Sequence, residues 1–328
     1  MKKTIGYVVT LIVIVFLLTA CNGESNSNET HNDDTLNIYT TLFPIEDFVT
    51  KIGGEHVEVH NIITAGTDPH TYEPTTKMIV EIAKGDAFIY SGDNLETYAD
   101  QISDAIETEN VSILEASKGL EAMHHEHEEG KAHPVNASVE HGDDEQDDAH
   151  GHSHDVDPHV WLDPIRSIRM AENIKDALVR LKPESKDLFE QNFKDLENDL
   201  EELDSSFHEV INQAKSKQIV VSHEAYGYWE EAYGIEQIGL SGMNQSGELS
   251  QKEIKKVINQ IEELNIRHIL FEQNTSSNIG ELVKQEVGAE ALTIHNLSVR
   301  THEETEQDED YFSLMNQNLE NLKIALNE

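Results

Sequence analysis

One stretch, PESKDLFEQNFKDLENDLEELDSSFHEVINQAK at residues 183–215, carries the longest continuous helical pattern in the chain. Its apolar side chains recur at alternating spacings of four and three residues, and they are Phe189, Phe193, Leu196, Leu200, Leu203, Phe207 and Val210. That period places them on one stripe of a helix. A helix of about 30 residues is about 45 Å long, enough to cross a whole domain. We therefore expect a rigid strut between two lobes, although the pattern would also fit a coiled-coil dimer segment.

Short apolar runs alternate with helical patterns on both sides of this stretch. The expected strands cover residues 36–39, 57–63, 87–90, 111–114, 219–222, 237–240, 268–271 and 292–294. The expected helices cover residues 43–52, 74–84, 95–107, 165–181, 250–264, 278–286 and 311–326. Strands that alternate with helices are typical of a mainly parallel sheet. The predicted fold class is therefore α/β, with an N-terminal lobe at 35–182, a linking helix at 183–215 and a C-terminal lobe at 216–328.

The first twenty residues have the order of a secretion signal. A lysine pair precedes an apolar run at residues 5–18, which is too short to be a comfortable membrane span. The run leads into Leu18-Thr19-Ala20-Cys21, which looks like a bacterial lipobox. We expect a signal peptide at 1–20 and a lipid on Cys21; the alternative is an ordinary signal peptide followed by an incidental cysteine.

The next segment, residues 21–34, consists of Asn, Ser, Asp and Glu with almost nothing apolar. Such a composition predicts a flexible tether between the lipid and the first folded residue. Cys21 is the only cysteine in the chain. The rest of the mature protein therefore has neither a disulfide nor a cysteine nucleophile.

Composition limits the classes of partner. The chain has 328 residues, enough for two lobes with a sizeable core. Its 64 Asp and Glu residues against 23 Lys and Arg give a formal net charge of −41. A field of this sign argues against nucleic acid as a partner and suits a soluble protein that attracts cations.

A His-rich insert, residues 121–156, interrupts the order of strands and helices. Its histidines stand among carboxylates, and they are His124, His125, His127, His133, His141, His150, His152 and His154. The insert has almost no large apolar residues, so we expect a disordered surface loop. Imidazole is largely neutral at physiological pH and binds borderline metals such as zinc. We expect the insert to capture zinc weakly; the alternatives are a sensor, a buffer or an insert without a role.

Three histidines outside the insert occupy positions of one kind. His70 stands in Asp68-Pro69-His70 after an expected strand, His159 stands in a second Asp-Pro-His tripeptide, and His223 directly follows the expected strand at 219–222. Residues just beyond the carboxyl ends of strands line the crevice of open α/β sheets. A proline before each of the first two histidines stiffens the backbone. The three histidines are therefore candidate metal ligands.

Four stretches of this chain, taken in order, resemble the metal-binding lipoproteins of ATP-driven zinc and manganese importers, specifically the zinc branch. They are DPHTYEP at 68–74, DPHVWLDP at 157–164, VSHEAYGY at 221–228 and DYFSLM at 310–315. The resemblance extends from about residue 36 to the end of the chain. It implies two α/β lobes joined by one long helix, with His70, His159 and His223 binding zinc in the cleft between them.

The same resemblance implies a function. The expected protein is not an enzyme: it captures Zn²⁺ with high affinity outside the cell and delivers the ion to an ABC permease in the membrane. It is expected to be a monomer, held at the extracellular face of the membrane by the lipid on Cys21, as in Gram-positive bacteria. Relatives selective for manganese usually carry a carboxylate at the position of His223. A histidine there favours zinc, because carboxylate and water suit the harder ion better.

The fourth zinc ligand is where the sequence departs from the family pattern. Three imidazoles leave one tetrahedral position open. Zinc-branch relatives often place Glu in the segment that resembles residues 295–301, whereas this chain has Ser298 there. A neutral hydroxyl is a poor zinc ligand. The candidates that remain are water, Glu272, Glu303 and Glu304.

Two other functions would use the same histidines. A secreted zinc hydrolase needs an open zinc position with a nearby general base, for which Glu224 is available beside His223. However, the sequence contains neither a His-Glu-x-x-His helix nor a Gly-x-Ser-x-Gly turn. A surface adhesin or zinc buffer that works without a permease is the other alternative.

Overall fold

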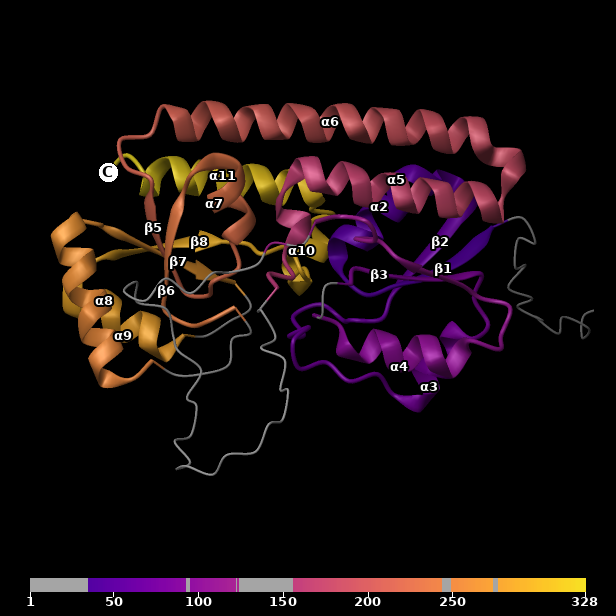
Figure 1. Cartoon of the computed structure of the whole chain (residues 1–328), viewed down its shortest axis with the longest axis horizontal. Coiled ribbons are helices and arrows are strands. Elements are labelled where there is room, and N and C mark those ends of the chain that lie inside the picture. Colours follow the sequence, from indigo (N-terminus) through magenta and orange to yellow (C-terminus); the bar gives the residue numbers. More distant parts are fainter. Residues whose placement is uncertain (1–34, 93–94, 122, 124–155, 244–248, 274–276) are drawn as a thin grey trace, which may run out of the picture. The chain divides into compact units, whose positions relative to one another are not determined.

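Two four-stranded sheets form the framework of the chain from Leu36 to Glu328 (Figure 1). The first has the order β2-β1-β3-β4, with β1 at Leu36–Thr40, β2 at Val57–Asn61, β3 at Ala87–Tyr90 and β4 at Ser112–Glu115. The second has the order β6-β5-β7-β8, with β5 at Gln218–Val221, β6 at Glu236–Gly239, β7 at His268–Glu272 and β8 at Glu290–Ile294. All six neighbouring pairs are parallel. The predicted α/β fold with mainly parallel sheets is confirmed.

The computed structural model describes residues 35–92, 95–121, 123, 156–243, 249–273 and 277–328. The expected signal peptide, Cys21, the expected tether and all eight histidines of the His-rich insert lie outside these residues. Among the helices of the described residues, none has both the length and the apolar character needed to cross a membrane.

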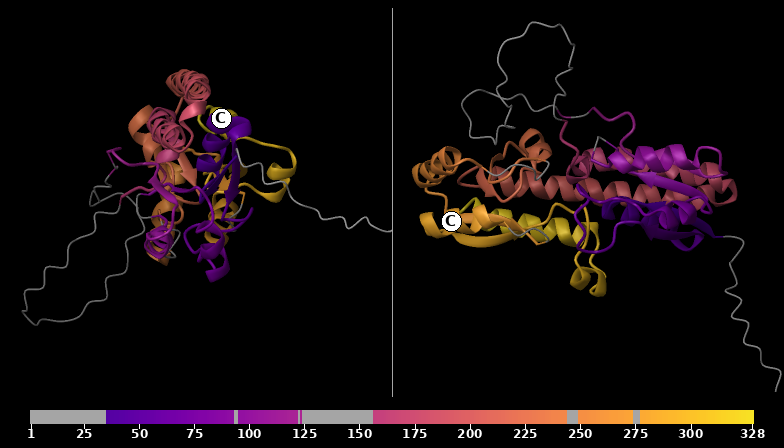
Figure 2. Two further views of the ribbon diagram at one scale, coloured as in Figure 1. Left: turned by 90° about the vertical axis from the view of Figure 1, so that its right-hand side faces the viewer. Right: turned by 90° about the horizontal axis from the view of Figure 1, so that it is seen from below.

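Helices lie on both faces of each sheet (Figures 1 and 2). The α-helices are α2 at Phe43–Gly53, α3 at Thr76–Ile82, α4 at Thr97–Ile106, α5 at Pro164–Leu181, α6 at Lys186–Asn212, α7 at Gly227–Tyr233, α8 at Gln251–Leu264, α9 at Asn278–Val287, α10 at His302–Glu306 and α11 at Tyr311–Ala325. The sequence did not predict α7 and α10. Both are shorter than the window over which a helical period becomes visible.

Helix α6 has 27 residues and buries five of the seven side chains of the predicted stripe, while Phe193 and Val210 are only partly buried. The expected start at Pro183 is instead a 3₁₀ turn at Pro183–Ser185, and the α-helix begins at Lys186. The buried side chains of α6 are Phe189, Leu196, Leu200, Leu203, Phe207 and Ile211. The helix packs on α2 and α5, beside the first sheet, and on α7 and α11, beside the second. One helix therefore contacts the elements of both halves, as a strut requires.

Replacing Leu200 by alanine is expected to lower the free energy of unfolding by about 2–5 kcal/mol, because a fully buried leucine leaves a cavity behind. Denaturant unfolding of the metal-free protein measures this change. The exposed Asp199 beside it is the matched control, and D199A should stay within about 0.5 kcal/mol of the wild type. Equal effects of the two substitutions would show that α6 does not pack on the core through this stripe.

Strand β5 shows how the second sheet separates two layers of core. Alternate side chains of a strand point to opposite faces. Ile219 and Val221 join the large apolar cluster that also contains the buried side chains of α6 and of the first sheet. Val220 instead joins a smaller cluster with Val257 of α8 and Val283 of α9. The large cluster runs without interruption from one half to the other, so burial of apolar surface couples the two halves.

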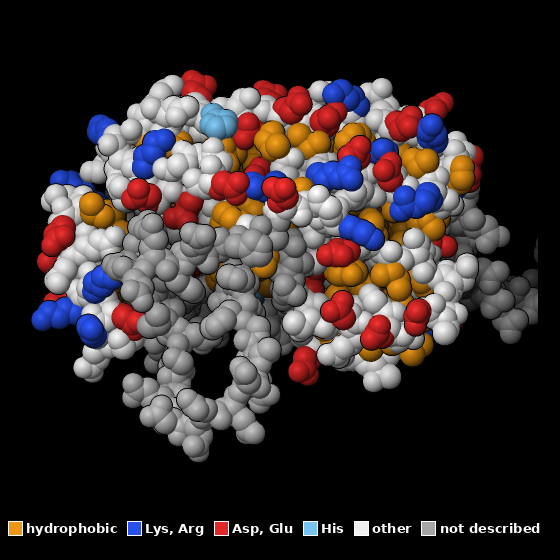
Figure 3. Space-filling model, in the orientation of Figure 1, with side chains coloured by type: hydrophobic (Ala, Val, Ile, Leu, Met, Phe, Trp, Pro, Cys, Tyr) orange, Lys and Arg blue, Asp and Glu red, His pale blue; other side chains and the backbone are white. Residues whose placement is uncertain are grey.

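Acidic and basic side chains are interspersed on the face drawn in Figure 3. Some charged side chains of the described residues form ion pairs within one helix, such as Lys194 with Glu197 at 2.6 Å on α6 and Arg169 with Glu172 on α5. Exposed pairs of this kind contribute about 0–1 kcal/mol each. They keep the surface of the long helices solvated and add little to the stability of the fold.

Candidate metal site

The two Asp-Pro-His tripeptides form the same local turn. The Asp68 carboxylate accepts the backbone N–H of His70 at 2.9 Å, and the Asp157 carboxylate accepts that of His159 at 3.0 Å. Proline has no N–H, so the first amide after the aspartate that can donate belongs to the histidine. The tripeptide thus fixes the histidine backbone relative to the aspartate, which explains why this residue order positions a side chain.

His223 is positioned by the adjacent strands β5 and β7. It stands two residues beyond β5, and Ser222 between them donates its N–H to the carbonyl of Leu270 on β7 at 2.9 Å. The last residue of β7 is Glu272, whose N–H donates to Ser222 Oγ at 3.2 Å. The carboxyl ends of parallel neighbours meet at one edge of a sheet. Glu272 therefore lies beside His223 although 49 residues separate them.

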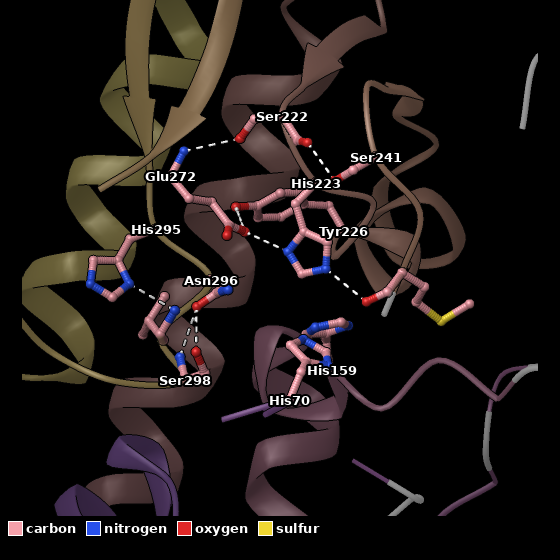
Figure 4. A network of polar contacts seen from close by, with 12 residues as sticks. His70, His159, Ser222, His223, Tyr226, Ser241, Glu272, His295, Asn296 and Ser298 are labelled. Atoms are coloured by element: carbon pink, nitrogen blue, oxygen red, sulfur yellow. Dashed lines mark hydrogen bonds and ion pairs between the residues drawn. The ribbon is translucent and has the colours of Figure 1, made fainter. Parts of the chain in front are cut away.

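The structure brings His70, His159 and His223 together, and we call these three residues the histidine cluster (Figure 4). Each offers one ring nitrogen, and the three nitrogens lie within 4.8 Å of one another. The ring centroids are 5.8 Å apart for His70 and His159, 5.5 Å for His70 and His223, and 5.2 Å for His159 and His223. Within the described ranges, this is the one group of three or more potential metal-ligating side chains at such spacing.

Two members of the cluster have a carboxylate on Nδ1. Asp157 Oδ1 lies 2.8 Å from His159 Nδ1, and Glu272 Oε1 lies 3.0 Å from His223 Nδ1. His159 Nε2 is buried and finds no hydrogen-bond partner among the described residues. His223 Nε2 lies 2.7 Å from the Met243 carbonyl. A carbonyl and a carboxylate both accept only, so this arrangement suits a His223 ring that donates from both nitrogens.

Burial and neighbouring charges shift the pKa values of the cluster in opposite directions. Burial, followed by the rings of His159 and His223, lowers the pKa of His70 to about 3. Burial also disfavours a charged His223, but the Glu272 carboxylate and the Met243 carbonyl outweigh this effect and raise its pKa. Burial opposes ionisation of Glu272, yet the charge of His223 lowers the pKa of this carboxyl below its ordinary value. Burial therefore keeps the His70 ring neutral, whereas the surroundings of His223 favour its doubly protonated form.

The segment that carries His159 is fastened to elements of the second half. Three indole or phenol groups make these bonds: Tyr228 donates to the carbonyl of Asp157 at 3.0 Å, Trp229 to that of Leu162 at 2.7 Å, and Trp161 to that of Asn296 at 2.7 Å. Arg166 of α5 also binds both carboxylate oxygens of Glu231 on α7 at 2.9 Å. These contacts hold His159 in a fixed relation to His223.

None of the expected fourth-ligand carboxylates joins the cluster in the described part of the chain. Glu272 Oε1 is taken up by His223 and by the hydroxyl of Tyr226, which donates at 3.2 Å. Glu304 forms a capping box with Thr301 and lies 3.2 Å from His295 Nε2. Glu303 is exposed and accepts from Gln307 at 3.1 Å.

Ser298 and Glu224, which the sequence analysis considers as a ligand position and a general base, also make contacts away from the cluster. The Ser298 hydroxyl donates to Asn296 Oδ1 at 2.7 Å. Glu224 lies against Gly239 of β6, where an added Cβ would come within 2.0 Å of Glu224 Cγ. Neither residue belongs to the group that the cluster forms within the described ranges.

Sequence reasoning named the three histidines but missed the roles of several neighbours. Asp157 was part of a recognised motif, and its contact with the His159 ring follows from the turn. The sequence predicts Glu272 only as a candidate ligand, whereas the structure places its carboxylate on the His223 ring. The Met243 contact has no local signal, because Met243 lies in a segment without a recognisable pattern.

Two parallel-sheet halves, one long helix packed on both and a buried histidine cluster define a two-lobed α/β protein of the kind that holds a small ligand between its halves. Residues 38–325 match the family model described as "Zinc-uptake complex component A periplasmic". The chain belongs to this family, so the resemblance drawn from the four sequence stretches is confirmed.

Two relatives of known name align with nearly the whole of this chain. It is 32% identical over 321 residues to the zinc-binding lipoprotein AdcA of Streptococcus pneumoniae, covering 98% of this chain but 60% of that relative. It is 30% identical over 327 residues to the high-affinity zinc uptake system protein ZnuA of Bacillus subtilis, covering 99% of this chain and 98% of the relative. The chain thus spans about 60% of the length of the streptococcal relative and nearly all of the Bacillus one.

A solved structure shares the fold. The Zn(II)-bound ZnuA-like domain of Streptococcus pneumoniae AdcA has a TM-score of 0.73 and 29% sequence identity, with 90% of this chain and 100% of that chain covered. The similarity over the whole of that domain supports the predicted arrangement of two α/β halves joined by one long helix.

Proposed function

We propose that this protein captures Zn²⁺ outside the cell with high affinity and delivers it to an ABC permease for uptake. The observation that carries the proposal is the convergence of three imidazole nitrogens within 4.8 Å. The relatives' names add support, since one is a zinc-binding lipoprotein and the other a high-affinity zinc uptake protein.

The geometry of the cluster needs little adjustment to hold zinc. Zinc binds imidazole nitrogen at about 2.0–2.1 Å with tetrahedral geometry, which places two ligand nitrogens about 3.3 Å apart. The nitrogens of the cluster lie within 4.8 Å of one another, so shifts of about 1–2 Å close the site. His223 Nε2 exchanges the Met243 carbonyl for the ion and keeps Glu272 on Nδ1.

In this proposal His70, His159 and His223 are the zinc ligands, and water fills the fourth position. Water is favoured because Glu272 and Glu304 have other partners, while Glu303 is exposed on α10. Three neutral nitrogen ligands select zinc over harder ions such as manganese. The ion is the cargo, so the protein holds it without transforming any substrate.

The proposal also includes the order of segments along the chain and the way in which the protein is held at the membrane. A signal peptide at 1–20 is removed, Cys21 carries the lipid that holds the monomer at the outer face of a Gram-positive membrane, and residues 21–34 form the tether. The lobes comprise 35–182 and 216–328, joined by 183–215. Capture of zinc by the His-rich insert stays a prediction from the sequence.

Growth at limiting zinc tests the transport role. A strain that lacks this protein is expected to grow poorly on chelator-treated medium and to recover with the wild-type gene or with added zinc. A variant with His70, His159 and His223 all changed to Ala should not restore growth, whereas H208A should, because His208 is an exposed histidine on α6. Unimpaired growth without the protein would favour a surface buffer or adhesin over import.

A further inference from the structure

Two buried carboxylates stand behind the histidine cluster. Asp157 is fully buried with Oδ1 on His159 Nδ1 at 2.8 Å, and Glu272 is 6% exposed with Oε1 on His223 Nδ1 at 3.0 Å. Each carboxylate engages Nδ1, the ring nitrogen next to the side-chain attachment, which leaves Nε2 for a metal. Among the described residues, no carboxylate lies on a ring nitrogen of His70, because Asp68 engages the backbone N–H of His70 and the side chain of Thr71 instead.

Both carboxylates are held by further bonds from fixed elements. Asp157 Oδ1 accepts the backbone N–H of His159 at 3.0 Å in addition to the ring. Glu272 ends strand β7, and its Oε1 also accepts the hydroxyl of Tyr226 at 3.2 Å. A carboxylate fixed in this way sets the tautomer and orientation of the imidazole that it touches and raises its basicity.

Charge balance makes these two carboxylates more important here than they would be in a site where an acid coordinates the metal directly. Three neutral imidazoles bring no negative charge to a buried dication, and such a charge is costly to bury without compensation. No carboxylate of the described residues joins the three histidines at ligand spacing, so the compensating charge has to come from acids outside the cluster. Asp157 and Glu272 together carry two negative charges, the number that a divalent ion requires.

We propose that Asp157 and Glu272 are positioning residues that balance the charge of the bound divalent cation through His159 and His223, in place of a carboxylate on the metal. The inference rests on the proposed function, since it assigns the source of charge for the same site. The ion binds to a ring nitrogen of His70 and to Nε2 of His159 and His223. The two acids do not touch the ion, and each acts on it through the imidazole that it contacts.

The isosteric variants E272Q and D157N test the charge directly, because an amide oxygen still accepts from Nδ1 while the negative charge is lost. Zinc affinity is measured by competition with a chromophoric chelator on the full-length mature protein lacking the eight insert histidines, each changed to Ser. Each variant is expected to bind one zinc about 10–100-fold more weakly than its parent. Affinity within twofold of the parent in both variants would overturn the proposal.

A second comparison separates charge from packing. S298E restores an acid in the segment where the family resemblance implies Glu, and it should strengthen zinc binding far more in the E272Q background than in the parent, because only E272Q lacks a compensating charge. An equal gain in both backgrounds would contradict the proposal. The visible absorption of bound Co²⁺, which reports a four-coordinate site, should be the same in E272Q as in the parent.

The result also distinguishes this inference from the proposed function. Stoichiometric zinc in the parent, its loss in H223A and an unaltered E272Q would uphold the histidine site while rejecting the charge role. A parent that binds no zinc would reject both.

Discussion

Changing His223 to alanine is expected to abolish stoichiometric zinc binding. The substitution removes one of three ligand nitrogens and leaves the buried Glu272 carboxylate without its ring partner. The loss should exceed the roughly 10–100-fold that removal of an outer partner causes. Alanine at His70 or His159 is expected to have the same effect, since two imidazoles alone do not complete a zinc site.

Metal content measured by elemental analysis after gel filtration checks this prediction, in a background that lacks residues 124–155 so that the insert histidines cannot retain zinc. His208 on α6 provides the matched control, because it is an exposed histidine remote from the cluster in sequence. One zinc per chain is expected in the parent and in H208A. Full zinc content in any of the three cluster variants would remove that histidine from the site.

Zinc affinity is expected to fall as the pH falls, by on the order of tenfold per pH unit once His223 is protonated before binding. Free imidazole titrates near pH 6.5, and Glu272 and Met243 raise the pKa of His223 above that value. A raised pKa means that the proton competes with zinc from higher pH downward. The pKa of about 3 at His70 means that this ring offers a neutral nitrogen throughout the same range.

Chelator competition between pH 8 and pH 5 measures this dependence, again without residues 124–155. The variant E272Q removes the charge that holds the proton on His223, so its affinity should change less steeply near neutral pH. An affinity that stays constant from neutral pH to pH 5 would mean that the ligands are not these three histidines.

Local pattern was enough to predict the framework. Leu196, Leu200 and Leu203 follow one another at spacings of four and three residues, which places them on one stripe of a helix, and α6 buries all three. The positions of His70 and His223 followed from the rule that residues beyond strand ends share one crevice. The strands were also located by their apolar runs, with ends that shift by one or two residues.

The hydrogen-bond partners of the cluster could not be predicted from the sequence, because they depend on the order of the strands in the sheet. Glu272 meets His223 only because β7 lies beside β5, an adjacency that no spacing in the sequence encodes. The bond between Trp229 and Leu162 likewise joins α7, which is too short to show a period, to the segment of His159. Ser298 could be recognised as a departure from the family pattern, but its engagement with Asn296 required coordinates.

The most direct measurement is a crystal structure of the zinc-loaded protein with anomalous scattering recorded at the zinc edge. The account predicts one strong zinc peak bound by a ring nitrogen of His70 and by Nε2 of His159 and His223 at about 2.0–2.1 Å, with the Met243 carbonyl displaced from His223. A zinc ion elsewhere in the folded halves, or cluster rings that turn away from one another in the loaded protein, would contradict it.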